Sequence, residues 1–447
     1  MRFIRKYIGD LFIPMRFYLL TGLCGLLFVL AFFVPVIYPF VRIIGWVYFM
    51  LICIDYIFMF FLGRSPRVKR MVGDRLSNGD QNRIILRISN RMNFAVHMTI
   101  IDELPAQFQV RDFELHKSFA ARQELQLGYS VKPTERGVYE FGRVLLYTTS
   151  GLGLLSRRFV IDAAQSVSVY PSFMQLRKYQ LISHTTLANE HGSKKYRKIG
   201  HSMEFEQIKD YVTGDDMRSI NWKATARKGM LMVNNYTDEK SQQVFCLVDK
   251  GRLMKMPFNG LSLLDYAINS SLVMTNVCLQ KQDKIGLITF ADKIGSVLPA
   301  ERKATQRENI LQVLYKQQTA FLESDFEMLY LQLRQKIKQR SLLVLYTNFE
   351  SLNGLHRQLP YLRSIARHHL LLVVFFENTE LSRLSHAEAH NLEDVYVKTI
   401  ADKFVSEKKM IVKELSKYGI LSILTSPENL TVNSINKYLE LKARQAI

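Results

Sequence analysis

Two long apolar stretches lie near the start of the chain. Residues 17–34 carry no charged side chain, and residues 43–62 carry only Asp55. At about 1.5 Å of rise per residue, a helix of either length reaches across the hydrocarbon core of a bilayer. Prolines interrupt the helical pattern between the two stretches. The pattern therefore predicts a two-helix transmembrane hairpin over residues 17–63.

Basic residues flank this hairpin unevenly. They occur in the tail, residues 1–16, and directly after the second stretch, whereas the connecting turn holds only Arg42. By the positive-inside rule both ends are cytoplasmic, which predicts a multi-pass protein of the inner cell membrane with cytoplasmic soluble domains. A cleaved signal peptide is the alternative, and the length of the first stretch and the lack of a small-residue cleavage pattern argue against it.

Asp55 is the one acidic residue within the predicted spans. A carboxylate near the centre of a spanning helix costs roughly 2.5–3.5 kcal/mol on insertion scales. We therefore expect Asp55 to face another helix or a polar cavity. There it would act as a hydrogen-bonded packing acid or, alternatively, as part of a functional relay.

Between residues 72 and 172 the hydrophobic pattern changes to an alternation of period two. Short runs such as RIILRIS, residues 83–89, are rich in β-branched side chains and are separated by turn residues. This spacing predicts a small antiparallel β-sandwich. No nucleophile, acid pair or ligand cluster occurs in it, so we expect a binding or spacing module. Residues 173–202 lose the period and form a basic linker, either solvated or in contact with anionic lipid.

The C-terminal part, residues 241–447, alternates short apolar runs with longer amphipathic ones. This order predicts a doubly wound, mostly parallel α/β domain that binds ligands at the carboxyl ends of its strands. The expected strands are residues 243–249, 285–290, 341–348, 370–376 and 420–424, and the expected helices are residues 261–280, 306–316, 326–339 and 405–418.

The net charge and the absence of known motifs disfavour several classes of function. The net charge of +20 calls for an acidic partner, which could be nucleic acid, an anionic membrane surface or an acidic protein. No basic platform interleaved with aromatics is present, which disfavours nucleic acid. The chain also lacks a P-loop, a Rossmann glycine fingerprint, a nucleophile elbow and zinc-type cysteine spacing. We therefore expect no catalytic residues and no cofactor.

Residues 203–240 mix acidic and basic side chains around Trp222. Arg218, Trp222 and Ala226 are four residues apart, so a helix beginning near Asp215 or Asp216 would place them on one face, with the aspartates as caps. Adjacent acids point in different directions and make a poor acid–base pair. The segment is either a buried ion-pair and capping network or a partner-docking surface.

Several motifs together resemble one family. Gly214-Asp215-Asp216, Arg218, Ile220-Asn221-Trp222 and Ala226-Arg227 occur in the order of the signature of domain of unknown function fifty-eight. That family comprises membrane-anchored bacterial proteins associated with MoxR-type AAA-plus ATPases. The resemblance implies such an ATPase as a partner and a von Willebrand factor A-like fold for the C-terminal domain. Lys209 departs from the pattern, which more often has arginine there.

The usual metal site of such a fold begins Asp-x-Ser-x-Ser after the first strand. Here Asp249 is followed by Gly251 and Leu253, which offer no side-chain oxygen, and Asn348 stands where a later acidic ligand is expected. Magnesium prefers a complete set of oxygen ligands. We therefore expect no bound metal, and Asp249 is a vestige of the site.

These expectations lead to an adaptor function. The chain is expected to be a non-catalytic, membrane-tethered scaffold that recruits protein partners, with its oligomeric state left open. The alternative is a divalent-metal-dependent hydrolase, such as a phosphoesterase, that uses Asp249 and Asp215. Lys250 and Arg252 lie at the rim of the vestigial site, and they are either ordinary solvated residues or part of the partner surface. The candidate partner-binding residues are Asp215, Asp216, Arg218, Trp222, Arg227, Lys250 and Arg252.

Overall fold

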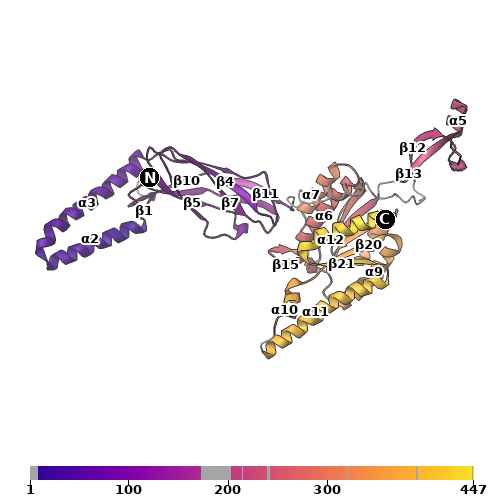
Figure 1. Ribbon diagram of the computed structural model, residues 1–447. Helices are drawn as coiled ribbons and strands as arrows, with labels where there is room; N and C mark the ends of the chain where they lie inside the picture. Colours follow the sequence, from indigo (N-terminus) through magenta and orange to yellow (C-terminus); the bar gives the residue numbers. More distant parts are fainter. Residues whose placement is uncertain are drawn as a thin grey trace. The chain divides into compact units, whose positions relative to one another are not determined.

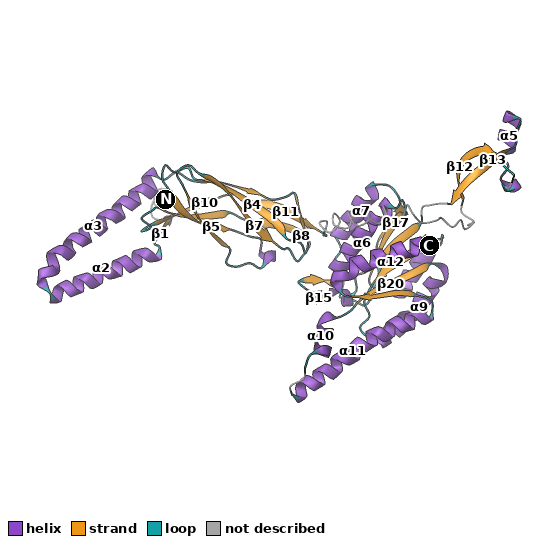
Figure 2. Cartoon of the chain, viewed as in Figure 1, coloured by secondary structure: helices purple, strands orange, loops and turns teal. Residues whose placement is uncertain are grey.

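A computed structural model describes the chain at residues 9–172, 203–213, 215–238, 242–319, 321–388, 391–444 and 446. The predicted basic linker and the first eight residues of the predicted tail lie outside these ranges. Contacts between Cα atoms divide the chain into two units, Met1–Tyr170 and Pro171–Ile447, and each is described by itself (Figures 1 and 2).

The first unit opens with the two apolar helices that the sequence predicts. Helix α2 spans Met15–Phe33, and helix α3 spans Tyr38–Ile57 and continues into a π-helical turn, η3, at Phe58–Leu62. A 3-10 turn, η2, joins them at Pro35–Ile37, where proline can start a helix but cannot continue one. Both helical stretches are long and apolar enough to cross a membrane.

Both ends of this helical hairpin connect to the β-strands of the same unit. Before α2, strand β1 (Leu11–Phe12) pairs with β10 (Ser156–Ile161). After η3, strand β2 (Arg67–Met71) pairs with β4 (Asn82–Ser89). Residues 11 and 12, which fall within the predicted tail, are thus part of a sheet.

The β-domain consists of three small sheets around one apolar core. Their strand orders are β1-β10-β9-β5-β6, β2-β4-β7 and β3-β11-β8. Inward side chains alternate with outward ones, as in β4, and form a single cluster that includes Ile84, Leu86 and Ile88. The remaining strands are β3 (Arg75–Ser77), β5 (Val96–Asp102), β6 (Glu114–Phe119), β7 (Glu124–Val131), β8 (Gly137–Phe141), β9 (Val144–Thr149) and β11 (Gln165–Tyr170).

The predicted β-rich domain is therefore present, with one departure from an all-antiparallel arrangement. Strands β3 and β11 pair in parallel. They come from opposite ends of the domain sequence, so no hairpin constrains their direction.

The second unit contains a six-stranded mixed sheet of order β18-β17-β14-β19-β20-β21. Strand β18 is an antiparallel edge, and the other five strands are parallel. Figure 2 shows helices covering this sheet. The strands are β14 (Gln243–Asp249), β17 (Lys284–Phe290), β18 (Ile294–Glu301), β19 (Leu342–Tyr346), β20 (Leu370–Phe376) and β21 (Leu421–Thr425).

Helices pack on both faces of the sheet, as expected for a doubly wound domain. One apolar cluster joins α6, α7 and α12 to one face, and a second joins α8, α9 and α11 to the other. The helices are α6 (Leu263–Gln280), α7 (Thr305–Tyr315), α8 (Phe326–Lys336), α9 (Leu352–His368), α10 (Thr379–His386), α11 (Leu392–Lys417) and α12 (Leu430–Ala443).

Helix α11 is longer than predicted, because it begins at Leu392 and not at residue 405. Asn391 caps it by accepting a hydrogen bond from the backbone N–H of Asp394. Few side chains in the first half of the helix are buried. Leu392, Tyr396 and Ile400 are nevertheless spaced four residues apart, and this spacing is a signal for the earlier start of the helix.

The chain leaves β14 for β17 on one side and later returns to β19 on the other side. Such a reversal of strand order opens a crevice at the carboxyl ends of the two neighbouring strands. Asp249 ends β14, and Thr347 and Asn348 follow β19. The sequence-predicted vestigial site is therefore located at the crevice.

Candidate functional site

Asp249 is 3% exposed, and its carboxylate accepts three hydrogen bonds from described residues of the protein. Its Oδ1 accepts hydrogen bonds from the Ser324 hydroxyl and, at 2.7 Å, from the backbone N–H of Gly251. Its Oδ2 accepts one from the Thr347 hydroxyl at 2.6 Å. Burial raises the pKa of Asp249, although these hydrogen bonds act in the opposite direction. The carboxylate is thus held inside the fold.

A lysine that the sequence did not single out lies beside the same crevice. The Lys408 Nζ donates to Asn348 Oδ1 at 2.7 Å and to the carbonyl oxygen of Phe349. Burial lowers the pKa of Lys408 to about 8, and the nearby Glu350 raises it only partly. An ammonium group therefore contacts the Asn348 side chain that replaces the expected acidic ligand.

The two basic rim residues differ in their surroundings. Arg252 forms an exposed ion pair with Glu323 at 3.0 Å, and Glu323 also contacts Arg357 at 3.5 Å. Among the described residues, Lys250 has no carboxylate within ion-pair distance, and it is half-buried. The positive charge of Arg252 is therefore partly balanced within the chain.

Residues 203–238 form a hairpin, with strand β12 (Met203–Asp210) antiparallel to β13 (Met232–Asp238). A 3-10 turn, η6 (Met217–Ser219), and a short helix, α5 (Trp222–Lys228), lie between the strands. This arrangement corrects the predicted helix beginning near Asp215 or Asp216. Ile220 is extended and bridges to Val233, which separates the turn from the helix. Arg218 and Trp222 consequently do not share a helix.

The acids of this hairpin stabilise its local structure. Asp215 accepts from Lys209 Nζ at 2.8 Å and from the backbone N–H of Val212 at 3.1 Å. These hydrogen bonds, the one from Lys209 first, lower the pKa of Asp215. Asp216 caps η6 by accepting from the backbone N–H of Arg218 at 3.0 Å. Neither carboxylate is free of local partners.

The side chains that remain available on the hairpin are apolar and basic. Trp222 is 69% exposed and Met217 is 73% exposed. Arg218 and Arg227 are exposed, and neither forms an ion pair with another described residue. The cap of α5 is supplied by Asn221, which accepts from the backbone N–H of Ala224. A capped helix therefore presents an indole with two arginines near it in sequence.

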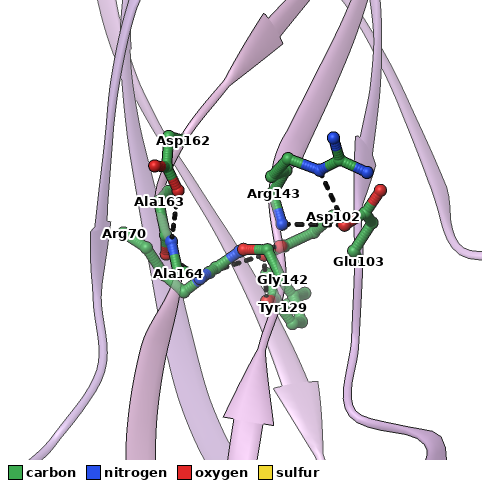
Figure 3. Close-up of polar contacts among 9 residues, drawn as sticks. All are labelled: Arg70, Asp102, Glu103, Tyr129, Gly142, Arg143, Asp162, Ala163 and Ala164. Atoms are coloured by element: carbon green, nitrogen blue, oxygen red, sulfur yellow. Dashed lines mark hydrogen bonds and ion pairs between the residues drawn. The ribbon is translucent and has the colours of Figure 1, made fainter.

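A buried polar cluster in the β-domain has a different character (Figure 3). Arg70 makes two contacts with Asp102, and Tyr129 donates to Asp102 Oδ2 at 2.5 Å. Arg70 also donates to the backbone carbonyls of Gly142 and Ala163. Burial, followed by the charge of Asp102, raises the pKa of Tyr129. The cluster is satisfied and closed to solvent, so it joins strands together and offers no binding group.

The Asp55 carboxylate contacts the loop between β9 and β10. It accepts from the Ser150 hydroxyl and from the backbone N–H groups of Leu154 at 3.1 Å and Leu155 at 2.8 Å. Arg157 of β10 donates to the carbonyl oxygen of Met59 at 2.8 Å. The described partners of Asp55 thus belong to the β-domain and not to a second helix.

The raised pKa of Asp249 predicts how stability depends on pH. The folded state keeps this proton to a higher pH than the unfolded chain, so stability falls as pH rises above the unfolded value of about 3.9. In Asp249→Asn this dependence disappears, and the amide can still accept from Gly251 and donate to Thr347. We expect a urea midpoint at pH 7 equal to or above that of wild type, with less advantage at pH 4.

Hydrogen exchange in β14, measured at increasing urea concentrations, provides this midpoint. Asp292→Asn, in the turn between β17 and β18, serves as the control. A midpoint for Asp249→Asn well below wild type at pH 7 would contradict the expectation and would indicate that the charge itself is required.

Comparisons with known proteins show that part of the chain is similar to one family. Residues 207–402 match the family described as "Protein of unknown function DUF58". The "Uncharacterized protein YeaD" of Bacillus subtilis (strain 168) is 24% identical over 188 residues, which are 41% of this chain. The match spans about half of that relative, 47% of its length.

Solved structures resemble the chain only weakly. The conserved hypothetical protein BatB from Bacteroides thetaiotaomicron has a TM-score of 0.31 and 11% identity, covering 46% of this chain and 100% of that one. The CARDB domain of the PF1109 protein from Pyrococcus furiosus, solved with di-metal ions, has a TM-score of 0.17 and 13% identity, covering 24% and 96%. Matches at these scores establish no shared function. The similarity to the DUF58 family of proteins of unknown function thus covers residues 207–402 of the chain.

Proposed function

We propose that this protein is a non-catalytic, membrane-tethered adaptor that binds a protein partner, a MoxR-type AAA-plus ATPase, through the 203–238 hairpin. The exposure of Trp222 carries the proposal. Exposed tryptophans are uncommon on surfaces that stay in water, and tryptophan and arginine are enriched among residues that dominate binding energy.

The charges of the hairpin suggest the chemistry of the partner surface. Because Asp215 and Asp216 are used locally, Arg218 and Arg227 supply the available charge near Trp222. An acidic patch with an apolar pocket for the indole would complement this surface. Lys250 and Arg252 at the rim of the crevice extend the same positive character.

The helical hairpin supports a membrane anchor. Its apolar side chains are largely exposed, as for Phe32 and Val36, and lipid would cover them. Because β1 precedes the first helix and pairs with β10, removal of that helix as a signal peptide would also take away a strand of the β-domain. The parallel sheet with Asp249 at the switch point also supports the finer assignment to a von Willebrand factor A-like fold.

The hydrolase alternative receives less support. It requires Asp249 and Asp215 to hold a metal ion or to act on a substrate. Each carboxylate instead accepts hydrogen bonds from its own neighbours. Within the described residues no group of three potential metal-ligating acids, histidines or cysteines is present.

Co-purification from native membranes tests the adaptor function. Tagged full-length protein carrying Trp222→Ala or Arg218→Ala is compared with wild type, and the ATPase that is recovered is quantified by mass spectrometry. Loss of a binding hot spot costs about 2 kcal/mol or more, so we expect at least a tenfold weaker association. Tyr396→Ala, an exposed aromatic on α11, is the matched control and should retain the ATPase.

Two results would reject this partner or this surface. Wild type that recovers no MoxR-type ATPase would reject the partner. Equal recovery with Trp222→Ala and with Tyr396→Ala would reject the hairpin as the docking surface. Faster hydrogen exchange in the α/β domain after Trp222→Ala would instead show that the hairpin packs on its own chain.

A further inference from the structure

A cavity of about 570 Å³ lies next to the crevice in the α/β unit. It is bordered by the 3-10 turn η7 (Arg252–Lys255), the short strand β15 (Pro257–Phe258), the ends of β20 and β21, and helices α10 and α11. Figure 1 shows α10 and α11 as neighbouring helices in this unit. Its apolar lining consists of Leu253, Met256, Pro257, Phe258, Leu263, Phe376, Leu381, Phe404, Val405, Leu424 and Pro427.

One half-buried cationic group lies in this apolar surface. Lys408 lines the cavity, and its two hydrogen-bond acceptors, Asn348 Oδ1 and the Phe349 carbonyl, are both neutral. Lys408 forms no ion pair with any described residue. An ammonium group has three donors, so one remains for a ligand. Its lowered pKa is the consequence of burial without a paired anion.

Most of the other charged groups of the cavity are exposed or already paired. Lys409, Glu350 and Glu380 are exposed, and Glu377 is half-buried. Arg252 is paired with Glu323. Among the described lining residues, Lys408 is therefore the half-buried cation of this apolar space, and Glu377 is its half-buried anion.

We propose that this cavity binds a small amphiphile that has one carboxylate and an unbranched apolar chain, with the carboxylate on Lys408. The volume falls within the range of about 300–1,000 Å³ that is typical of small-molecule sites. A carboxylate would give the half-buried ammonium an ion pair, which none of the described residues provides. The apolar lining would cover the chain of the ligand. The site shares no residue with the 203–238 hairpin, and Arg252 is the one described lining residue that it has in common with the proposed partner surface.

Octanoate is a suitable probe because it is soluble and carries this combination of groups. Full-length protein in lipid nanodiscs is titrated calorimetrically, with empty nanodiscs subtracted. We expect saturable binding of octanoate to wild type and at least tenfold weaker binding to Lys408→Met. Lys403→Met removes a lysine from the same helix outside the cavity and should bind as wild type does. Octan-1-ol should bind at least tenfold more weakly than octanoate, and octylammonium should not bind.

A second variant keeps the test informative if Lys408→Met fails to fold. Val405→Phe fills the cavity and leaves Lys408 in place, so it should abolish octanoate binding. Any of three results would overturn the proposal: no saturable binding to wild type, equal binding of octanoate and octan-1-ol, or unchanged affinity in both Lys408→Met and Val405→Phe.

Discussion

Arg70→Ala is expected to lower the free energy of opening of the β-domain by about 3–5 kcal/mol, because it leaves the buried carboxylate of Asp102 without its cation. Arg70 and Asp102 have almost no side-chain exposure. The substitution also removes the hydrogen bonds to the carbonyls of Gly142 and Ala163, which come from two different turns. Hydrogen exchange of peptides from β4 and β7, measured on the full chain, reports this free energy.

A neighbouring arginine offers a matched control (Figure 3). Arg143 pairs with Glu103 at 3.6 Å, one residue further along than Asp102, but its side chain is 59% exposed. Exposed pairs contribute about 0–1 kcal/mol, so Arg143→Ala should leave exchange in β4 and β7 nearly unchanged. Similar effects of the two substitutions would show that the buried cluster does not hold the β-domain together.

Regular elements could be predicted wherever they leave a clear hydrophobic pattern in the sequence. The apolar helices and the fully buried strands β14 and β20 are continuous apolar runs, and strands such as β4 alternate, so each has such a pattern. Strand β18 lacks such a pattern because it is a half-exposed edge strand. Helix α9 contains Pro360, and a proline in the sequence normally indicates the end of a helix. The parallel pairing of β3 with β11 depends on residues far apart in the sequence.

The 203–238 hairpin shows why the spacing of its motif predicted a helix that begins too early. The spacing of Arg218, Trp222 and Ala226 is compatible with one helical face. The bridge between Ile220 and Val233 forms only when β13 pairs back, and it restricts the helix to Trp222–Lys228. A contact between distant positions therefore decided the local conformation.

The sequence could predict where the candidate site lies in the fold, but not which residues contact Asp249 and Asn348 there. The carboxyl ends of strands locate Asp249 and Asn348, because a doubly wound sheet brings such ends together. Ser324 and Lys408 come from a loop and a helix far away in the sequence, and no motif marks them. Their contacts with Asp249 and Asn348 are visible only in the folded chain.

Asp55→Ala is expected to release the β9–β10 loop from the end of α3. The substitution leaves the buried backbone N–H groups of Leu154 and Leu155 without an acceptor. Each unsatisfied buried group costs about 1–3 kcal/mol, so for the two together we expect a loss of about 2–6 kcal/mol. Amide exchange at these two residues, in full-length protein in nanodiscs, should accelerate about thirtyfold or more. Asp55→Asn should give a smaller effect, because its single side-chain oxygen can still accept one of the amides.

Asp162→Ala provides the comparison that separates a buried acceptor from an exposed one. Asp162 also accepts a backbone N–H within the β-domain, that of Ala164 at 3.4 Å, but its side chain lies in solvent. Its removal should leave exchange at Leu154 and Leu155 as in wild type. If Asp55→Ala also leaves it unchanged, the joint between α3 and the β-domain depends on Arg157 and its bond to the Met59 carbonyl. The carboxylate in the predicted span would then have no role in positioning the β-domain on its anchor.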